Sequence, residues 1–338
     1  MNATSPVLEQ QIPPQAVLMQ MTMGFIVSQA VSVAAKLFIA DHLKDSAKTV
    51  EELAQLTETH APSLYRLMRA LTSVGVFRQD AENRFSNTPI SEFLRSDHPE
   101  SMRGAAHMIC DQEHWRPHGN MFQSVKTGEI AFDYTFGMPV FPYFAENPEA
   151  AQVFDDAMTS FSLGIAKAVA ATYDFSDAKT IADIGGGHGS LLSTVLKTNP
   201  NAKGILFDQP QVVAGADVSD RIKIVHGDFF SEIPVKADIY LMKFILHDWN
   251  DEQSIVILKN LAQSAETGAK LLLVETVIEE DDNAPSMSKV MDLNMLVMTG
   301  GKERTAKEYA ELFEKTGFRL TNVYPTPSPL QIVEAVKV

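Results

Sequence analysis

The sequence predicts an α/β protein in which a mostly parallel sheet, covered by helices on both faces, follows a mainly helical N-terminal region. Two observations lead to this prediction. From residue 178 onward, short apolar runs alternate with runs of helix formers, which is the pattern of a parallel sheet with helical crossovers. Before residue 100 the order is helix, helix and small hairpin, as in a winged helix. We therefore expect an N-terminal domain over residues 1–112 and a sheet domain over residues 113–338.

The composition is that of a soluble globular protein. The 338 residues are 45% hydrophobic and 21% charged, and the net charge is −15. Surfaces that bind nucleic acid are usually basic, so this charge argues against a nucleic-acid partner. The single cysteine, Cys110, cannot form an internal disulfide, and we expect it to be a small buried apolar residue. A cytoplasmic location fits this cysteine usage.

The N-terminal stretch between Glu9 and Lys36 carries no charge and is long enough to cross a bilayer. Pro13, Pro14 and several polar residues interrupt it. We therefore favour a helix over residues 17–43 that is buried on most sides, for example in a subunit interface. The N-terminus lacks the basic cluster that opens a signal peptide. We expect neither a membrane span nor a secretory signal.

The winged-helix pattern begins with a capping box, because Thr49 is followed three residues later by Glu52. This pair predicts a helix over residues 50–56, and a second helix follows over residues 64–73 before a hairpin near residues 77–85. Such a unit can bind DNA.

The second helix of this pattern, where a DNA-reading surface would lie, offers only Arg66 and Arg69 as cations. Its remaining positions are largely apolar, and the whole chain is acidic. We therefore favour a scaffolding or dimerisation role for the N-terminal domain over DNA binding.

Residues 100–175 are expected to be mostly helical, with an irregular piece over residues 128–142. This region is rich in aromatic side chains, among them Trp115, Phe154 and Phe161. Packing between the domains explains most of them, but a wall for a flat apolar substrate is a second reading. Both interpretations can hold for different residues.

The C-terminal half contains seven expected strands. They are predicted at residues 180–184, 204–208, 222–226, 237–242, 270–275, 318–324 and 330–336. Helices are predicted at residues 189–198, 251–264, 286–298 and 305–316. The last two strands are close in sequence, so we expect them to pair antiparallel at one edge of the sheet.

A glycine-rich turn follows the first strand, where residues 183–189 read Asp-Ile-Gly-Gly-Gly-His-Gly. Without Cβ atoms the backbone of such a turn can lie close to a ligand, and the helix behind it points its N–H groups to the same place. A dinucleotide turn requires a third glycine where this chain has Ser190. A nicotinamide oxidoreductase is therefore the weaker of two interpretations, and an S-adenosylmethionine turn is the stronger.

Acidic residues follow the next two strands. Asp208 ends the second strand, and an acid there can accept the ribose hydroxyls of an adenosine, although Asp also caps helices. Asp228 and Phe229 follow the third strand, where the acid can accept from an adenine amino group and the ring can cover the base. The carboxyl ends of parallel strands are where open α/β sheets bind ligands.

A histidine just past the fourth strand, His247, is the candidate general base. A neutral imidazole with a pKa near 6.5 can accept a proton at neutral pH. Two acids come later, Glu275 at the end of the fifth strand and Glu303 near a Gly-Gly pair. A carboxylate bonded to one imidazole nitrogen fixes the tautomer and stabilises the imidazolium.

Several motifs together carry a resemblance to a known family. They are Asp183 to Gly189, Phe207-Asp208-Gln209-Pro210, Gly227-Asp228-Phe229, Leu246-His247-Asp248-Trp249 and Gly300-Gly301-Lys302-Glu303-Arg304-Thr305. In this order the chain resembles the small-molecule O-methyltransferases of the caffeic acid and acetylserotonin type, including bacterial natural-product enzymes. The resemblance covers nearly the whole chain. It implies a Rossmann-like seven-stranded methyltransferase sheet and an N-terminal winged-helix dimerisation domain.

The resemblance also implies roles for single residues. His247 would be the base, flanked by Glu275 and Glu303. The S-adenosylmethionine site would comprise Asp183, Gly185, Gly187, Asp208, Asp228, Phe229 and Lys243. The site for an aromatic acceptor would comprise Trp115, Phe154, Met158, Phe161, Asp248 and Asn294. The family works as a homodimer without a metal, and we expect neither a nucleic-acid nor a membrane partner.

The expected reaction is methyl transfer to a phenolic or enolic hydroxyl of an aromatic small molecule. A relative that kept the fold but changed its chemistry, to hydroxylation or decarboxylation, or that serves only as a binding subunit, is the main alternative. The presence of His247, Glu275 and Glu303 argues against that alternative. The sequence does not identify the acceptor.

Overall fold

A computed structural model describes residues 12–216, 218–280 and 285–338 of the chain. The chain divides into two compact units, Met1–Asp111 and Gln112–Val338. Each has its own hydrophobic core.

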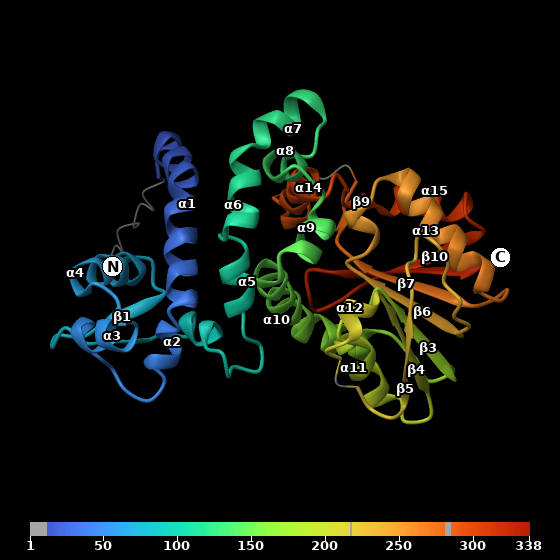
Figure 1. Cartoon of the computed structure of the whole chain (residues 1–338), viewed down its shortest axis with the longest axis horizontal. Coiled ribbons are helices and arrows are strands. Elements are labelled where there is room, and N and C mark those ends of the chain that lie inside the picture. The colour runs from blue at the N-terminus through green and yellow to red at the C-terminus, as the bar shows by residue number, and fades with distance from the viewer. Residues whose placement is uncertain (1–11, 217, 281–284) are drawn as a thin grey trace, which may run out of the picture. The chain divides into compact units, whose positions relative to one another are not determined.

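The first unit contains helices and one hairpin, coloured blue to cyan in Figure 1. Its elements are α1 (Pro14–Lys36), α2 (Ile39–His42), α3 (Val50–Leu56), α4 (Ala61–Ser73), β1 (Phe77–Gln79), β2 (Phe85–Asn87), η1 (Ser91–Leu94) and α5 (Arg103–Met108). The expected capping box is present, because Thr49 accepts from the Glu52 backbone and Glu52 accepts from the Thr49 backbone. The hairpin is antiparallel, and Cys110 is buried as expected.

The prediction for helix α1 concerned its bounds and its burial. The expected helix over residues 17–43 is broken at Phe38, whose φ of 51° separates α1 from α2. Within this chain the helix is largely exposed, since Leu18 and Met21 are 67% and 74% exposed, so its burial in a subunit interface stays a prediction. Its buried residues are small ones near the C-terminal end, Ser32, Ala34 and Ala35. The apolar surface of α1 is therefore covered by little else in the described chain.

By length and composition α1 is long and apolar enough to cross a membrane, the one such helix among the residues described. A single helix of this kind is weak evidence, because core helices and signal sequences meet the same criteria.

The second unit begins with helices. They are α6 (Gln112–Gly119), α7 (Met121–Thr127), α8 (Ala131–Phe136), α9 (Val140–Glu146) and α10 (Pro148–Thr172). The expectation of an irregular piece over residues 128–142 is wrong, because α8 and the start of α9 occupy it. Gly128 and Gly137 adopt left-handed C-cap conformations that end α7 and α8, so the chain turns between short helices. Phe132, Phe144 and Phe154 pack in a small core there with the end of α14 (Met287–Met298).

The seven-stranded sheet has the order β10-β11-β7-β6-β3-β4-β5. The strands are β3 (Thr180–Ile184), β4 (Lys203–Asp208), β5 (Ile222–His226), β6 (Ile239–Lys243), β7 (Lys270–Glu275), β10 (Phe318–Pro325) and β11 (Gln331–Lys337). β3 to β7 are parallel, while β11 pairs antiparallel with both β7 and β10. The predicted α/β fold and its antiparallel edge are confirmed.

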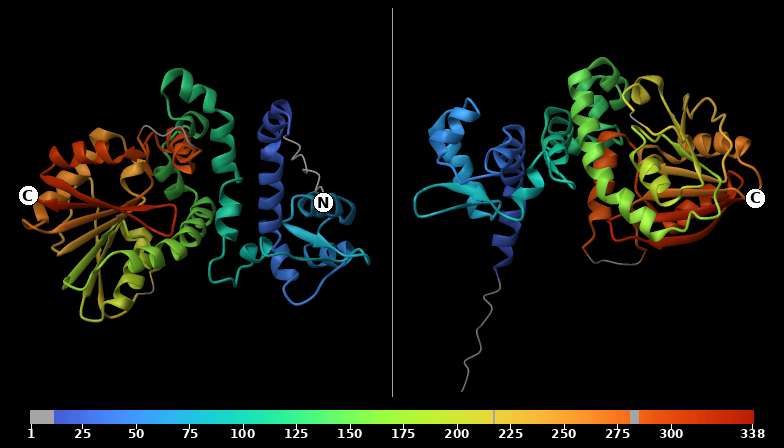
Figure 2. Two further views of the ribbon diagram at one scale, coloured as in Figure 1. Left: turned by 180° about the vertical axis from the view of Figure 1, so that it is seen from behind. Right: turned by 90° about the horizontal axis from the view of Figure 1, so that it is seen from below.

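Helices cover both faces of this sheet (Figures 1 and 2). Ile181 and Leu241 face a core formed with α10 and α11 (Ser190–Thr198), whereas Ala182 and Met242 face a core formed with α13 (Asp251–Ser264) and α15 (Ala306–Glu314). Side chains alternate along each strand, so one strand supplies both cores. The remaining elements are α12 (Pro210–Val213), η2 (Leu246–Asp248), β8 (Val277–Ile278) and β9 (Arg304–Thr305).

Candidate active site

The glycine-rich turn joins the carboxyl end of β3 to α11. Gly185 and Gly187 have φ values of 69° and 59°, which side chains rarely adopt. A Cβ on Gly185 would lie 2.4 Å from the Ile245 side chain, whereas a Cβ on Gly187 would meet nothing within 4 Å. The turn therefore packs at Gly185 against the loop that follows β6, and it leaves open space at Gly187.

Asp208 ties this turn to the end of β4. Its Oδ2 accepts a hydrogen bond from Gly187 N at 2.8 Å, and its Oδ1 accepts one from Gln209 N at 2.7 Å. A carboxylate oxygen can accept more than one hydrogen bond, so capacity for a hydroxyl remains. Burial raises the pKa of the Asp208 carboxyl. The role expected for Asp208 in ribose binding stays a prediction.

Asp228 and Phe229 follow β5 at the same edge of the sheet. Asp228 is exposed, and its Oδ1 accepts from Phe230 N at 2.9 Å. Phe229 packs edge-on against Trp249, with ring centroids 6.2 Å apart. The arrangement leaves the Asp228 carboxylate facing solvent beside an aromatic surface.

Asp183 and Lys243 lie at the ends of neighbouring strands. Asp183 is only 1% exposed, and neither of its carboxylate oxygens has a hydrogen-bond partner among the described residues. Burial raises its pKa to about 7, and burial likewise lowers the pKa of Lys243. A Cβ on Gly186 would lie 2.6 Å from the Asp183 carboxyl carbon, so Asp183 supports the turn from below.

His247 lies in η2, just past β6, at the centre of a buried cluster. Its Nδ1 lies 3.0 Å from Glu303 Oε1 and 3.7 Å from Glu275 Oε2. Its Nε2 lies 3.8 Å from Asp248 Oδ1. Glu275 is fully buried, and its Oε1 accepts from Ile245 N and Leu246 N at 3.0 Å each. The fold thus brings together the three side chains that the sequence selected.

Surrounding charge changes the proton affinity of His247. Burial lowers the pKa of its imidazole, but the carboxylates of Glu275, Asp248 and Glu303 outweigh burial and raise the pKa to about 10. Burial raises the pKa of Glu275 to about 7 and that of Asp248 to about 6. The ordinary value near 6.5 assumed from the sequence therefore does not hold, because three acids face the ring.

The same cluster has the donors of a small cation site. His247, Glu275 and Glu303 each offer one atom within 4.8 Å of the others. Among the described residues, Oε2 of both glutamates has no hydrogen-bond partner. Imidazole and carboxylate donors suit several divalent metals. The expectation that no metal takes part stays a prediction.

The six residues expected around the acceptor come from several elements. Phe154, Met158 and Phe161 lie on α10 and are partly buried, Trp115 lies on α6, Asn294 lies on α14, and Asp248 ends η2. Helix α14 contacts α6 and α8. Asp248 is beside the His247 ring, whereas the role of the other five in acceptor binding stays a prediction.

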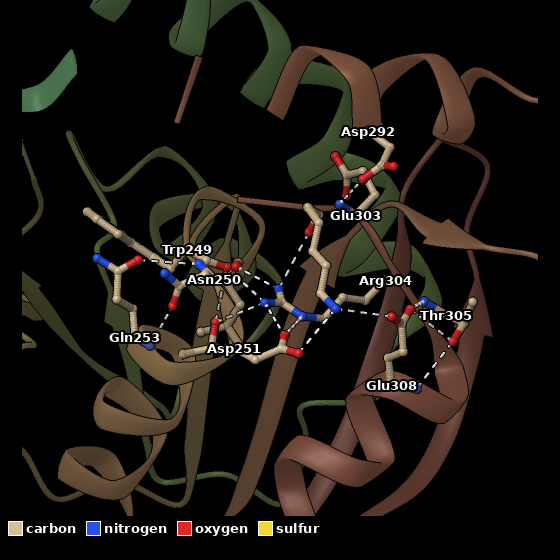
Figure 3. A network of polar contacts seen from close by, with 12 residues as sticks. Trp249, Asn250, Asp251, Gln253, Asp292, Glu303, Arg304, Thr305 and Glu308 are labelled. Carbon is tan, nitrogen blue, oxygen red and sulfur yellow. Dashed lines mark hydrogen bonds and ion pairs between the residues drawn. The ribbon is translucent and has the colours of Figure 1, made fainter. Parts of the chain in front are cut away.

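Sequence reasoning missed Arg304, which follows Glu303 (Figure 3). Its guanidinium is fully buried and donates to the carbonyls of Leu246 and Trp249 at 2.8 Å each. It also donates to Asp251 Oδ1, from Nε at 3.1 Å and from Nη2 at 2.9 Å. Arginine is almost never fully buried unless it is paired, so no local pattern reveals this position.

Comparison with known proteins identifies the family. The family model of the O-methyltransferase domain matches residues 115–319, and that of the O-methyltransferase dimerisation domain matches residues 19–97. The chain belongs to the O-methyltransferase family. This confirms the predicted S-adenosylmethionine-dependent O-methyltransferase and its N-terminal dimerisation domain at the level of the family.

Individual relatives span nearly the whole chain. It is 45% identical to the phenazine O-methyltransferase PhzM of Lysobacter antibioticus, over 96% of each chain. It is 37% identical to the mitomycin biosynthesis 6-O-methyltransferase of Streptomyces lavendulae, over 91% of this chain and 90% of the relative. The structure of human N-acetylserotonin methyltransferase in complex with S-adenosylmethionine superposes with a TM-score of 0.91 at 25% identity, covering 97% of this chain and 99% of that one.

The relatives do not all methylate oxygen. An 8-amino-8-demethylriboflavin N,N-dimethyltransferase of Streptomyces davaonensis is 31% identical over 94% of each chain.

Proposed function

We propose that this enzyme transfers a methyl group from S-adenosylmethionine to a phenolic or enolic hydroxyl of an aromatic small molecule, with His247 as the general base. The observation that carries this proposal is the buried cluster in which Glu303 and Glu275 face one ring nitrogen of His247. A lone structural histidine would not need two buried carboxylates. The family membership supports the methyl donor.

The residues at the sheet edge fit S-adenosylmethionine. Open space at Gly187 allows a ligand close to the backbone, Asp208 and Asp228 offer acceptors for hydroxyl and amino groups, and Phe229 offers an aromatic face. Lys243 would lie along the methionine part. When bound, this donor supplies a sulfonium methyl group that is already activated for displacement.

The chain's own residues would orient the acceptor and take its proton. Glu303 holds His247 Nδ1, so Nε2 is the nitrogen left for the acceptor hydroxyl. The acceptor oxygen forms its bond to the methyl carbon while the carbon–sulfur bond breaks, and the electron pair of that bond stays on sulfur. The hydroxyl proton passes to Nε2. General-base assistance of this kind is worth about 10²- to 10⁴-fold.

The raised pKa of His247 adds a condition to this step. With a pKa of about 10, the imidazole of the free enzyme is protonated at neutral pH. An acceptor that arrives as a phenolate would then pair with the imidazolium, which is the same overall protonation state as a phenol beside a neutral imidazole. A sulfonium in the site would also repel the imidazolium and favour its neutral form.

The test is incubation with methyl-labelled S-adenosylmethionine and a panel of hydroxylated phenazines and simpler phenols. The matched control for each acceptor is its methyl ether, in which the hydroxyl is blocked. Label on oxygen, located by mass spectrometry and absent from the methyl ethers, supports the proposal. Label that appears only on nitrogen of arylamines in a parallel panel contradicts it in favour of N-methylation.

N-methylation is the second candidate because one relative carries that activity by name. An amine nucleophile sheds its proton after attack, so it depends less on a base. Altered chemistry on the same fold, such as hydroxylation or decarboxylation, remains the alternative if donor binding occurs with no transfer to any acceptor.

We also propose that the enzyme is a homodimer built on α1. Leu18, Met21 and Phe25 leave an apolar surface exposed, and the matched dimerisation domain includes most of this helix. Covering such a surface is favourable. Light scattering should give twice the mass of the chain, and Met21→Glu should give the monomer.

A further inference from the structure

We propose that Arg304 is a positioning residue for His247, which fixes the backbone on both sides of the imidazole while its neighbour Glu303 fixes the ring. This inference rests on the proposed function of His247 for its effect on turnover. It names a residue with no contact to the reacting atoms. Four sets of contacts carry it.

The first set lies on the backbone around His247. Arg304 Nη1 donates to Leu246 O and Nη2 donates to Trp249 O, both at 2.8 Å. These carbonyls precede and follow the pair His247–Asp248. One rigid, planar guanidinium therefore holds both ends of the η2 turn, which lysine cannot do with a single ammonium.

The second set ties the same guanidinium to the start of α13. Asp251 Oδ1 accepts from Nε and Nη2 (Figure 3). Ser254 Oγ accepts from Nη2 at 3.2 Å. Asn250 caps this helix through a capping box with Gln253. The turn that carries His247 is thus anchored to a capped helix.

The third set holds the backbone around Glu303, which is the partner of His247 Nδ1 in their hydrogen bond. β9 pairs parallel with β8, with Arg304 opposite Val277, two residues beyond Glu275. Glu303 N donates to Asp292 Oδ1 on α14 at 3.0 Å. Glu303 and Arg304 are adjacent, so a shift of either moves the carboxylate that holds His247 Nδ1.

The fourth observation is the close approach of the two segments. A Cβ on Gly301 would lie 2.0 Å from His247 O and 2.5 Å from the Asp248 carbonyl carbon. The Gly301 backbone therefore packs directly on the backbone of η2. Burying a guanidinium is costly. Here the buried guanidinium of Arg304 connects the segment that carries His247 to the segment that carries Glu303.

The chain contains a matched control. Arg221 also uses its guanidinium to hold backbone carbonyls, those of Leu196, Asn199, Pro200 and Ala202, at 2.7 to 3.2 Å. These carbonyls lie from the last turn of α11 to the residue before β4, at the opposite end of the strands from His247. Arg221→Lys therefore replaces a guanidinium that also holds several backbone carbonyls, but at a place remote from His247.

The experiment compares Arg304→Lys with Arg221→Lys in the full-length enzyme. We expect Arg304→Lys to lower kcat about 10- to 100-fold, with KM for S-adenosylmethionine nearly unchanged, because outer contacts that orient a reacting group have effects of this size. We expect Arg221→Lys to lower the melting temperature but to leave kcat within about twofold. Equal kcat values in the two variants, together with a loss of kcat in His247→Ala, would overturn the proposal.

A second readout does not depend on chemistry. The proton on His247 Nδ1, bonded to Glu303, should give a downfield NMR signal that is missing from His247→Ala. We expect this signal to broaden or shift in Arg304→Lys and to persist in Arg221→Lys. An unchanged signal in Arg304→Lys overturns the proposal. If the signal is lost there but His247→Ala turns over normally, the base assignment fails while the positioning role stands.

A milder pair covers the case in which Arg304→Lys does not fold. Asp251 is about half exposed, with 49% of its side chain accessible. Asp251→Asn weakens its grip on the guanidinium, and we expect a threefold to tenfold loss of kcat, a fraction of the full effect. Lys302→Met removes the ion pairs of Lys302 with Asp251 at 3.2 Å and with Glu308 at 3.1 Å, and it leaves Arg304 in place. It should keep kcat within about twofold, and a loss as large as that of Asp251→Asn would contradict the proposal.

Discussion

Phe38 in the first unit and Phe244 in the second share an uncommon backbone conformation. Their φ values are 51° and 56°, and for a bulky side chain the left-handed region is an outlier that costs about 1–2 kcal/mol. Each ring also has a cation over its face, Arg103 Cζ at 4.4 Å from Phe38 and Lys243 Nζ at 4.5 Å from Phe244.

Apart from the cation, the surroundings of the Phe38 and Phe244 rings differ. Phe38 is 41% exposed and marks the corner between α1 and α2. Phe244 lies nearly parallel to the His247 imidazole, with centroids 5.2 Å apart and planes inclined by 15°. The same conformation therefore lies at a helix corner in one unit and beside the His247 imidazole in the other. Strain alone does not identify a functional residue, so the contacts of each strained residue must be compared.

The largest expected effect tests whether the ring beside Phe244 does chemistry. His247→Ala should lower kcat for an acceptor hydroxyl about 10²- to 10⁴-fold, while the affinity for S-adenosylmethionine, measured by calorimetry, changes little. His42→Ala in the first unit serves as the control and should keep full activity. Wild-type turnover by His247→Ala would mean that the contact between Phe244 and His247 only contributes to packing.

The next largest effect concerns the charge around that ring. Glu275 is the foremost of the carboxylates that raise the pKa of His247 to about 10. A raised pKa means that the imidazole loses its proton only at high pH. In the wild type, kcat/KM should therefore increase with pH, along the acid limb of the profile, up to about the pKa of His247. In Glu275→Gln the limb should move to lower pH by about one unit or more.

The control for this pH profile is Glu334→Gln. Glu334 is also a buried acid on the sheet, but its carboxylate bonds Tyr173 and Thr321. Its removal should leave the acid limb in place. Identical profiles for wild type and Glu275→Gln would mean that the limb reports another group.

Much of the fold could be predicted from the sequence because its signals are local. Residues close together in the sequence are enough to explain several elements. Examples are the capping pairs Thr49–Glu52 and Asn250–Gln253 and the apolar runs of β3 and β7. His247, Glu275 and Glu303 could be selected because each follows a strand or a glycine pair on one edge of a parallel sheet.

Other features depend on residues far apart in the sequence. The burial of Arg304 requires the turn after β6 and the start of α13, and nothing within several residues of Arg304 indicates either. The raised pKa of His247 arises in part from the adjacent Asp248, but also from carboxylates 28 and 56 positions away, Glu275 and Glu303. The exposure of α1 within its own chain likewise depends on distant residues, because composition alone does not distinguish a core helix from one in a subunit interface.

A direct comparison replaces each left-handed phenylalanine by glycine. Phe244→Gly and Phe38→Gly both relieve backbone strain and lose a ring, so their melting temperatures should change by similar small amounts. Only Phe244→Gly should lower kcat, by roughly 10-fold, because the imidazole loses the face that aligns it. Phe244→Trp keeps an aromatic face and should recover most of that loss. A fall in kcat for Phe38→Gly as large as that for Phe244→Gly would erase the distinction between the two positions.

The smallest effect extends the comparison to glycines. Gly75 in the first unit and Gly187 in the second both have positive φ, 80° and 59°, and a Cβ on either would meet nothing within 4 Å. Gly75→Ala and Gly187→Ala should each lower stability by about 1–2 kcal/mol, the cost of a left-handed alanine. If the donor lies against the turn, Gly187→Ala should also weaken S-adenosylmethionine binding several-fold, whereas Gly75→Ala should not. Calorimetric titration of both variants separates the two effects, because equal affinities would mean that the open space at Gly187 is not where the donor binds.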